Sequence, residues 1–313
     1  MPETPETPQT PAGPAIPATA ATPATPPRRR RQRVARWGFA VTVTLALGLS
    51  VWSMEQVPNA SWMPVLVGLV PWVVGKYLLC PLRWHALSVS GRGRGWHLRA
   101  YAEGELFGLV SPAHVGADLW RMHRLQRVGL SRGAAATEVG MDRLIGSLGL
   151  TVFVVLAGAT LPPQLLVAAA VIALALVAGG LVVHRRRPQL LAERPLPSRR
   201  VLAKGVLISI GYQLSLLCLV FGAVAAMGGT VDPVALLGVF GASQVAGILP
   251  GVHGASPREG ALVVGLAHLG LSWTAAVGAV ALMAVLAWGP ALLLGGASLA
   301  AYRLRYGRPL VAA

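Results

Sequence analysis

Two Pro/Gly interruptions occur in long apolar stretches of this chain, and charged residues lie beside both. The first is PAHVGA at 112–117 and the second is PGVHGA at 250–255. Proline removes a backbone amide donor, and glycine lets another backbone approach closely. Helices therefore break here and expose N-terminal amides, which favour anions. A lipid phosphate is an anion of suitable size, so the two breaks are the candidate headgroup site.

Charged side chains near the breaks complete this candidate site. A carboxylate at the centre of a bilayer costs roughly 2.5–3.5 kcal/mol, and it is tolerated when it is paired or faces water. We expect a polar route in which arginines meet the phosphate and acids balance their charge, with Glu103 and Glu105 leading to the first break. The predicted headgroup-binding residues are Pro112, Gly116, Asp118, Arg121, Asp142, Arg143, Pro250, Gly254, Arg258 and Glu259.

The same charges also allow a purely structural interpretation. Asp118 with Arg121, Asp142 with Arg143, and Arg258 with Glu259 could form ion pairs that hold helices together or flank the membrane surface. The sequence alone leaves both interpretations open.

Metal and cofactor chemistry are not expected. The histidines in the two breaks, His114 and His253, have no neighbouring cysteine or paired acids, so no metal site is predicted. No nucleophile motif, phosphate-binding loop or dinucleotide loop is present, and we therefore predict neither a cofactor nor an enzymatic activity.

Composition indicates that membrane helices position these residues. Hydrophobic types make up 54% of the 313 residues and charged types only 12%, with a mean hydropathy of +0.61. A water-soluble fold of this size could not cover its surface with about half the usual share of charges. The net charge of +16 lies in short segments between apolar runs. That pattern favours anchoring to an anionic membrane surface and disfavours nucleic acid as a partner.

The predicted fold is all-α and polytopic, with about six transmembrane helices and two re-entrant broken segments. A bilayer core of ~30 Å needs about 20 apolar residues in a helix. Residues 100–117 and 234–271 are broken, and Asp118–Val128 is predicted to be an interfacial helix. The predicted spans are Gly38–Met54, Trp62–Cys80, Asp142–Leu161, Gln164–Val183, Gly205–Met227 and Trp273–Ser298.

Basic residues predict the orientation. With both termini in the cytoplasm and both broken segments re-entrant, 24 of the 27 Lys and Arg lie on the cytoplasmic side. The exceptions are Lys76, Arg143 and Arg258. If 234–249 instead crossed completely, the Arg-rich tail would lie outside, so the charge bias favours the re-entrant arrangement.

The chain divides into a leader, a membrane domain and a tail. Residues 1–36 are Pro/Thr-rich and then basic, typical of a disordered cytoplasmic leader, with a ligand for a proline-binding partner as the alternative. Residues 37–301 form the membrane domain and 302–313 a basic cytoplasmic tail. Residues 37–161 and 164–298 each contain two spans, a broken segment and a span. Because three crossings is an odd number, this order predicts an inverted repeat.

Several stretches, in this order and spacing, resemble the flippase-like family, also described as the lysylphosphatidylglycerol synthase transmembrane region. They are RW at 83–84, SPAHVGADLWR at 111–121, MDRLIG at 141–146, ILPGVHGASPREGALV at 248–263 and LGLS at 269–272. The resemblance implies a lipid flippase or lipid-transport role in the inner membrane, typically for aminoacylated or glycosylated lipids. These residues include no counterpart of the soluble domain of bifunctional members, so we do not expect synthase activity.

The resemblance also implies site residues. The family's motif positions fall on Gly116, Asp118, Arg121, Asp142, Arg143, Pro250, Gly254 and Glu259. This chain departs from the pattern at Ala117, where the family usually has a second glycine, and at Gly254–Pro257, where a glycine-rich run is thinned. Backbone approach at the second break is therefore expected to differ.

We expect this protein to move a polar-headed lipid, anionic, aminoacylated or glycosylated, between the leaflets of the plasma (inner) membrane. Without a nucleotide-binding element, transport would be passive or ion-coupled. The first alternative is a non-transporting membrane partner of a lipid-modifying or glycosyl-transferring enzyme, contacted through the leader and the basic loops. The second is an intramembrane enzyme using Glu259 or Asp142 as an acid or base, which the missing nucleophile and metal ligands disfavour.

Overall fold

The computed structural model describes residues 61–109, 111–156, 163–186, 197–247, 249, 251, 253–254 and 256–306, all within the compact unit Val41–Ala313. Across these residues the secondary structure is helical and contains no strand, which confirms the predicted all-α class. The predicted leader 1–36, the predicted span Gly38–Met54 and Pro250 lie outside the described residues.

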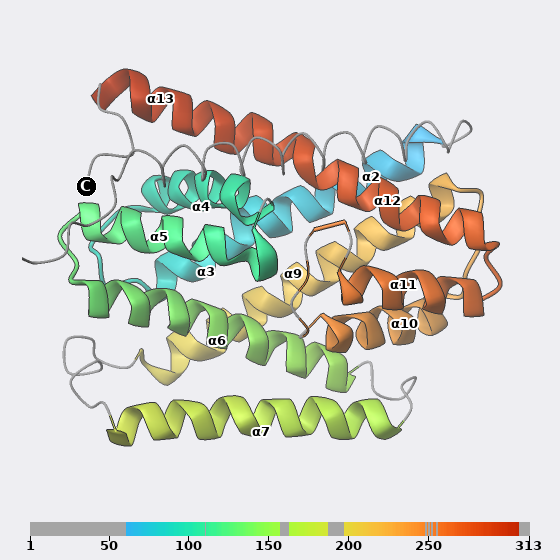
Figure 1. The fold of residues 1–313 in the computed structure, drawn as a ribbon, viewed down its shortest axis with the longest axis horizontal. Coiled ribbons are helices and arrows are strands. Elements are labelled where there is room, and N and C mark those ends of the chain that lie inside the picture. Colours follow the sequence, from blue (N-terminus) through green and yellow to red (C-terminus); the bar gives the residue numbers. More distant parts are fainter. Residues whose placement is uncertain are drawn as a thin grey trace, which may run out of the picture. The chain divides into compact units, whose positions relative to one another are not determined.

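The helices vary widely in length (Figure 1). Two of the long stretches contain a π-helical segment, η1 or η4, and the first break contains the short 3-10 turn η2. In chain order they are α2 (Trp62–Val74), η1 (Gly75–Leu79), α3 (Cys80–Leu87), α4 (Arg94–Leu109), η2 (Pro112–His114), α5 (Val115–Arg127), α6 (Arg132–Leu156), α7 (Pro163–Arg186), α9 (Arg199–Ala226), α10 (Pro233–Ala246), α11 (Pro257–His268), α12 (Trp273–Pro290), η4 (Ala291–Gly296) and α13 (Ala297–Tyr306).

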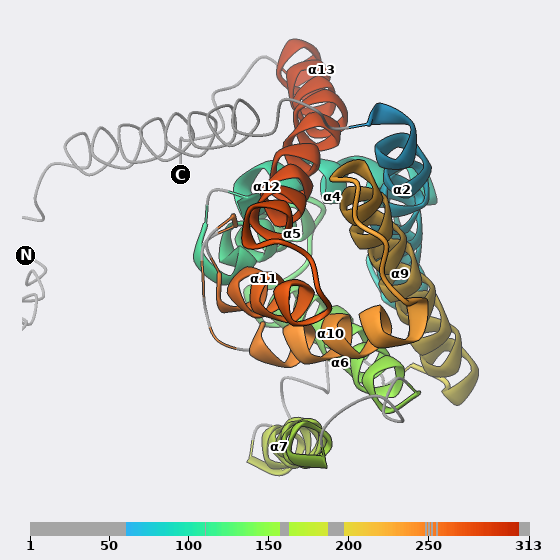
Figure 2. The same cartoon turned by 90° about the vertical axis from the view of Figure 1, so that its right-hand side faces the viewer.

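Four helical stretches in the described part of the chain are long and apolar enough to cross a membrane. They are Trp62–Leu87, Arg132–Leu156, Arg199–Ala226 and Trp273–Tyr302. Each overlaps one of the predicted spans, so length and composition support a multi-pass membrane protein. Helix α7 covers the predicted span Gln164–Val183 and packs at the edge of the bundle, against α6 and α10 (Figure 2).

Helix α6 begins ten residues before the span that the sequence predicts. The sequence pattern places Asp142 at the start of a span, whereas α6 begins at Arg132. Ser131 caps the helix, because its Oγ accepts a hydrogen bond from the amide of Ala134 at 3.1 Å. Asp142 therefore lies within the helix and is only 1% exposed. The ten helical residues before Asp142 combine small residues with Arg132, Thr137 and Glu138, and hydropathy alone does not assign them to the apolar run.

The helices are interrupted at both Pro/Gly breaks, and the two breaks meet. Helix α4 packs on α5 around the first break, and α10 packs on α11 around the second. Ala113 and His114 adopt left-handed backbone conformations, with φ of 51° and 61°. The amide of Ala113 donates a hydrogen bond to the carbonyl oxygen of Gly251 at 3.0 Å. Segments more than a hundred residues apart in sequence thus contact each other through their backbones.

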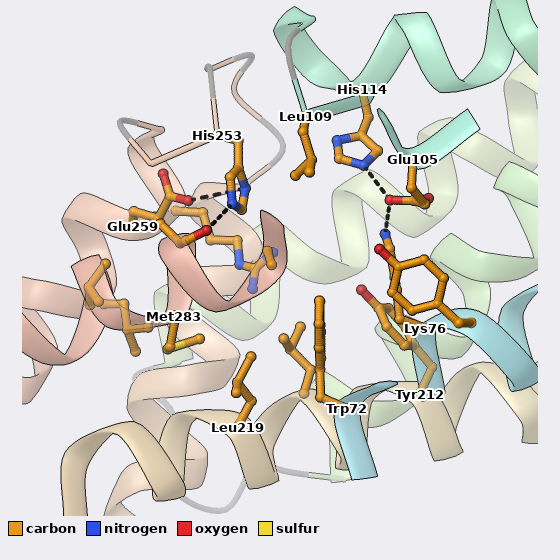
Figure 3. Close-up of a pocket in the computed structure, with 17 residues that line it drawn as sticks. Trp72, Lys76, Glu105, Leu109, His114, Tyr212, Leu219, His253, Glu259 and Met283 are labelled. Carbon is orange, nitrogen blue, oxygen red and sulfur yellow. Dashed lines mark hydrogen bonds and ion pairs between the residues drawn. The ribbon is translucent and has the colours of Figure 1, made fainter. Parts of the chain in front are cut away.

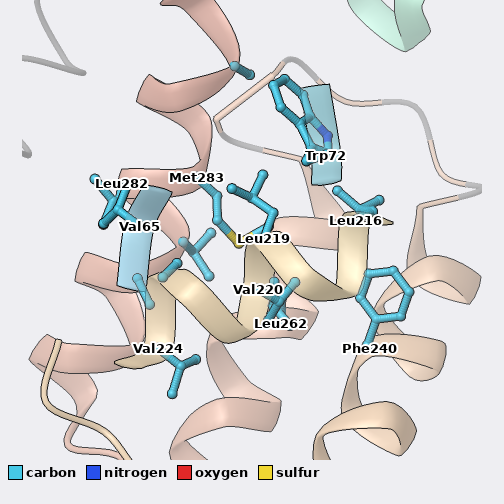
Figure 4. Close-up of a cluster of buried hydrophobic side chains, with 14 of the residues drawn as sticks. Val65, Trp72, Leu216, Leu219, Val220, Val224, Phe240, Leu262, Leu282 and Met283 are labelled. Atoms are coloured by element: carbon cyan, nitrogen blue, oxygen red, sulfur yellow. The ribbon is translucent and has the colours of Figure 1, made fainter. Parts of the chain in front are cut away.

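Helices α2 and α9 pack backbone to backbone. A Cβ atom on Gly68 would lie 2.6 Å from the carbonyl oxygen of Cys218, and one on Gly222 would lie 2.5 Å from that of Pro64. Small residues permit such close approach between membrane helices. The main hydrophobic core surrounds this contact and extends to α10, α11 and α12 (Figure 4).

Gly222→Ala should lower the free energy of unfolding by about 1–3 kcal/mol, the usual cost of overpacking. The added methyl group would meet backbone atoms that cannot rotate away. Gly211→Ala, in the same helix, is the matched control, because its Cβ would meet only the end of the Leu79 side chain at 3.3 Å. Thermal unfolding in detergent measures both variants, and equal effects would contradict the close packing.

Candidate functional site

A cavity of about 100 Å³, which we call the first cavity, lies where the two breaks meet (Figure 3). Trp72, Leu219 and Met283 line one part of its wall, and polar side chains line the rest. Those polar residues are Lys76, Tyr77, Glu105, His114, Tyr212, His253, Arg258 and Glu259. The cavity therefore combines apolar surface with charges of both signs, as a site for an amphiphile requires.

A second cavity, of about 190 Å³, adjoins the first. Arginines dominate its charged lining, which contains Arg83, Arg121 and Arg143 together with the two acids Glu105 and Asp142. Four residues line both cavities, namely Lys76, Glu105, His114 and Tyr212. These shared residues form the partition between the two cavities.

Asp142 holds two buried arginines in the second cavity. Arg83 makes a bidentate contact, with its Nε 2.8 Å from Oδ1 and its Nη2 3.2 Å from Oδ2. Arg121 adds a third hydrogen bond, from Nη1 to Oδ2 at 2.8 Å. Because such charge-assisted pairs are strong and directional, Asp142 ties α3 and α5 to α6.

Asp118 links the same network to the surface. It forms ion pairs with Arg121 and with Arg143, whose Nη2 lies 2.8 Å from Asp118 Oδ2. The Arg143 side chain is 46% exposed and also donates to the carbonyl oxygen of His114 at 3.3 Å. The structural interpretation therefore describes Asp118, Arg121 and Asp142 well, while Arg143 keeps a solvent-facing side. The predicted partnership of Asp142 with Arg143 is replaced by one with Arg83 and Arg121.

Glu105 joins α4 to both α2/η1 and the first break. Its Oε2 lies 2.9 Å from Lys76 Nζ and 3.0 Å from His114 Nε2. Glu105 is buried, so its carboxylate depends on Lys76 and His114 as partners, because an isolated buried charge is costly. A Cβ on Gly108 would lie 2.7 Å from the His114 ring, so a glycine is needed where the ring packs on α4.

Lys76 is the functional candidate that sequence reasoning missed. It lies in η1, and π-helical segments are frequent at functional sites. The sequence pattern identifies Lys76 only as a basic residue that does not lie on the cytoplasmic side. A single lysine inside an apolar run of a predicted span is itself a signal of a functional residue.

At the second break, the Glu259 carboxylate is hydrogen-bonded to backbone amides. Its carboxylate accepts hydrogen bonds from the amides of Ser256 at 2.7 Å and Gly254 at 2.9 Å. Ser256 Oγ accepts in turn from the Glu259 amide, which completes a capping box at the start of α11. His253 Nε2 donates a hydrogen bond to the carbonyl oxygen of Ala284, 3.1 Å away. The candidate pair of Arg258 with Glu259 is not formed.

Arg258 is the cation without a partner in this site. It lines the first cavity and is half-buried, yet it makes no ion pair or hydrogen bond with any described residue. Its arrangement differs from that of Arg83 and Arg121, which are held by Asp142. The geometry leaves the Arg258 guanidinium available to an anion that enters the cavity.

Glycines set the backbone geometry of the breaks. Gly116 donates its amide to Ser111 Oγ at 2.8 Å, and a Cβ there would lie 2.3 Å from the carbonyl oxygen of Phe107. Gly254 has a φ of 90°, which other residues rarely adopt. Pro112 begins the 3-10 turn η2. Both predicted glycines are thus required by the local conformation.

Two further buried acids hold helices together outside the cavities. Glu103 accepts from Trp120 Nε1 at 3.1 Å and from Ser298 Oγ at 2.8 Å, and Glu138 accepts from Trp84 Nε1 at 3.0 Å. Neither acid lines the two cavities. Among the residues that the structure describes, no three His, Cys, Asp or Glu side chains gather into a metal-binding group.

Comparison with known proteins gives one finding. The family model described as "Lysylphosphatidylglycerol synthase TM region" matches residues 35–295. The match includes both breaks, both cavities and the ion pairs around Asp142. Neither the curated proteins nor the solved structures include a match to this chain.

Proposed function

This chain belongs to the family of lysylphosphatidylglycerol synthase transmembrane regions, and on that premise we propose that it moves a polar-headed lipid between membrane leaflets. The single observation that carries the proposal is that Arg258, in a cavity lined by both breaks, has no partner among the residues that the structure describes. A buried cation usually has a partner, because desolvation of an unpaired charge is costly. A lipid phosphate provides such a partner when it enters.

The composition of the two cavities supports an anionic group in the headgroup. Arg143 offers a partly exposed cation in the second cavity, and Arg258 offers one in the first. A phosphodiester bound at either position gains charge-assisted hydrogen bonds. Aminoacylated phospholipids, and those glycosylated lipids whose sugar is attached through a phosphate, carry the same phosphodiester that these arginines recognise.

The proposal includes a membrane arrangement. In this arrangement six spans surround two re-entrant hairpins, and the two halves form an inverted repeat. The protein lies in the plasma membrane, with both termini in the cytoplasm. Ala113 and Gly251 each follow the proline of their break, and their hydrogen bond joins equivalent positions of the two PxxxGA stretches. Contact between equivalent positions is what a local two-fold axis between the halves would produce.

Reconstitution into liposomes tests the transport function. Fluorescent phosphatidylglycerol, phosphatidylcholine and a glycolipid are compared, and a membrane-impermeant reductant quenches the label in the outer leaflet. We expect exchange of the anionic lipid between leaflets to exceed that in protein-free vesicles. If folded protein exchanges none of the three lipids, the transport proposal is wrong.

The alternative, a non-transporting partner of a lipid-modifying or glycosyl-transferring enzyme, makes a different prediction. Its contacts would lie in the leader and the basic loops. Deletion of residues 1–27 should leave lipid exchange unchanged in a transporter. A docking protein would show no exchange before the deletion and would lose its enzyme partner after it.

A further inference from the structure

The partition between the two cavities consists of side chains whose contacts can be exchanged. We propose that Lys76, Glu105 and His114 form a gate, which opens when an anionic headgroup replaces Glu105 as the partner of Lys76. The anion in this inference rests on the proposed lipid function. The gate itself rests on the geometry of the two cavities.

The three side chains converge on one atom. Both Lys76 Nζ and His114 Nε2 contact Oε2 of Glu105, at 2.9 and 3.0 Å (Figure 3). All three residues line both cavities. A group passing from one cavity to the other must therefore displace this cluster.

Lys76 is suited to an exchange of partners. Its ammonium is a point charge on a flexible stem, and it binds without the fixed geometry of a guanidinium. It lies 5.8 Å from the centre of the Tyr212 ring, which offers a second contact for the cation during the exchange. Arg83 differs, because its bidentate contact with Asp142 fixes its orientation. The second cavity thus has a rigid wall and one mobile cation.

His114 supplies the second mobile element. It lies within the first break, and its backbone is left-handed, a conformation that costs energy for a residue with a Cβ. When Lys76 turns to a phosphate, Glu105 keeps its hydrogen bond with His114. Neither Lys76 nor Glu105 is then left as an isolated buried charge, since Lys76 contacts the phosphate and Glu105 contacts His114.

The gate lies between the cations available on either side. Arg143 is accessible in the second cavity, and Arg258 is accessible in the first. A phosphate can therefore move from Arg143 to Lys76 and then to Arg258. This order of contacts requires that the two cavities open to opposite sides of the membrane and that the gate separates them when no anion is bound.

Thiol labelling tests the gate without a measurement of lipid exchange. In a background of Cys80→Ala and Cys218→Ala, a reporter is introduced by Ser147→Cys in the second cavity or by Met283→Cys in the first. A membrane-impermeant maleimide should label each reporter from one side of the proteoliposome, and the two reporters from opposite sides. Glu105→Gln leaves Lys76 without a counter-ion, so labelling from the other side should rise at least tenfold.

A double substitution tests passage of the anion. Lys76→Met with Glu105→Leu removes both charges together, so the protein should remain folded while the partition becomes apolar and closed. Exchange of fluorescent phosphatidylglycerol should fall at least tenfold. The matched control is Arg124→Met with Glu103→Leu, a buried pair 3.2 Å apart that lines neither cavity. This control should keep its exchange, and size-exclusion elution verifies that both variants fold.

The outcomes separate the gate from the lipid function. If each reporter is labelled from one side only, and Glu105→Gln allows labelling from both sides, the gate is supported even if the native protein moves no lipid. If each reporter is labelled from the same side with and without Glu105→Gln, the gate proposal is wrong. Exchange that persists in the Lys76/Glu105 double variant also overturns it, because the pair would then be only structural.

Discussion

Asp142→Asn should lower the free energy of unfolding by about 3–5 kcal/mol, the usual effect of removing one partner from a buried ion pair. The substitution leaves Arg83 with a neutral amide in place of its bidentate carboxylate. It also weakens the contact with Arg121, which is 4% exposed. The two guanidinium groups are only 7% and 4% exposed, so solvent compensates for little of the lost charge, and α3, α5 and α6 lose their common anchor.

The matched control is Asp118→Asn, on the surface side of the same network. The Asp118 side chain is 22% exposed. Its partner Arg143 is 46% exposed, and the other partner of Asp118, Arg121, keeps the hydrogen bond with Asp142. We expect a loss of about 1 kcal/mol or less, typical of an exposed pair. Thermal unfolding followed by tryptophan fluorescence in detergent compares the two variants. Equal losses would show that the Asp142 network does not hold the three helices together.

Arg258→Gln should reduce exchange of phosphatidylglycerol between leaflets by about tenfold to a hundredfold. A hydrogen bond to a charged group contributes about 1.5–3 kcal/mol, and each 1.4 kcal/mol changes a rate or binding constant tenfold. Arg258 has no partner in the described structure, so its removal should cost little stability. Loss of exchange with retained thermal stability is the combination expected for a residue that binds the headgroup.

Two controls accompany this substitution. Arg258→Lys keeps the positive charge and should retain part of the exchange. Arg127→Gln removes an exposed arginine of α5 that lines neither cavity, and exchange should stay at the native level. If Arg258→Gln behaves like Arg127→Gln, the first cavity is not on the lipid route.

The positions of the helices and their breaks could be predicted because they depend on local sequence. Proline and glycine act on the residues beside them, so the interruptions at 112–117 and 250–255 were visible in the sequence. Apolar runs of sufficient length indicated the spans for the same reason. The start of α6 could not be predicted from hydropathy, since its first three turns are rich in small residues and its start depends on a cap at Ser131.

The partners of the charged residues could not be predicted in the same way. Arg83 and Asp142 are 59 positions apart, and only the packing of α3 on α6 brings them together. Asp118 and Arg121, at i and i+3 on one helix, are the exception that local spacing does reveal. The role of Glu259 was also readable, because Ser256-Pro-Arg-Glu259 matches the S-x-x-E capping box. Because Glu259 caps α11, Arg258 is the charged residue of this pair that has no partner among the described residues.

A density map of the protein in a phosphatidylglycerol bilayer tests the central claim most directly. The account predicts that Ala113 and Gly251 touch at the depth of the hydrocarbon core, with lipid phosphate density beside the guanidinium of Arg258. Breaks that lie apart in bulk solvent, or an Arg258 that faces water with no lipid near it, would contradict a headgroup route between the two breaks.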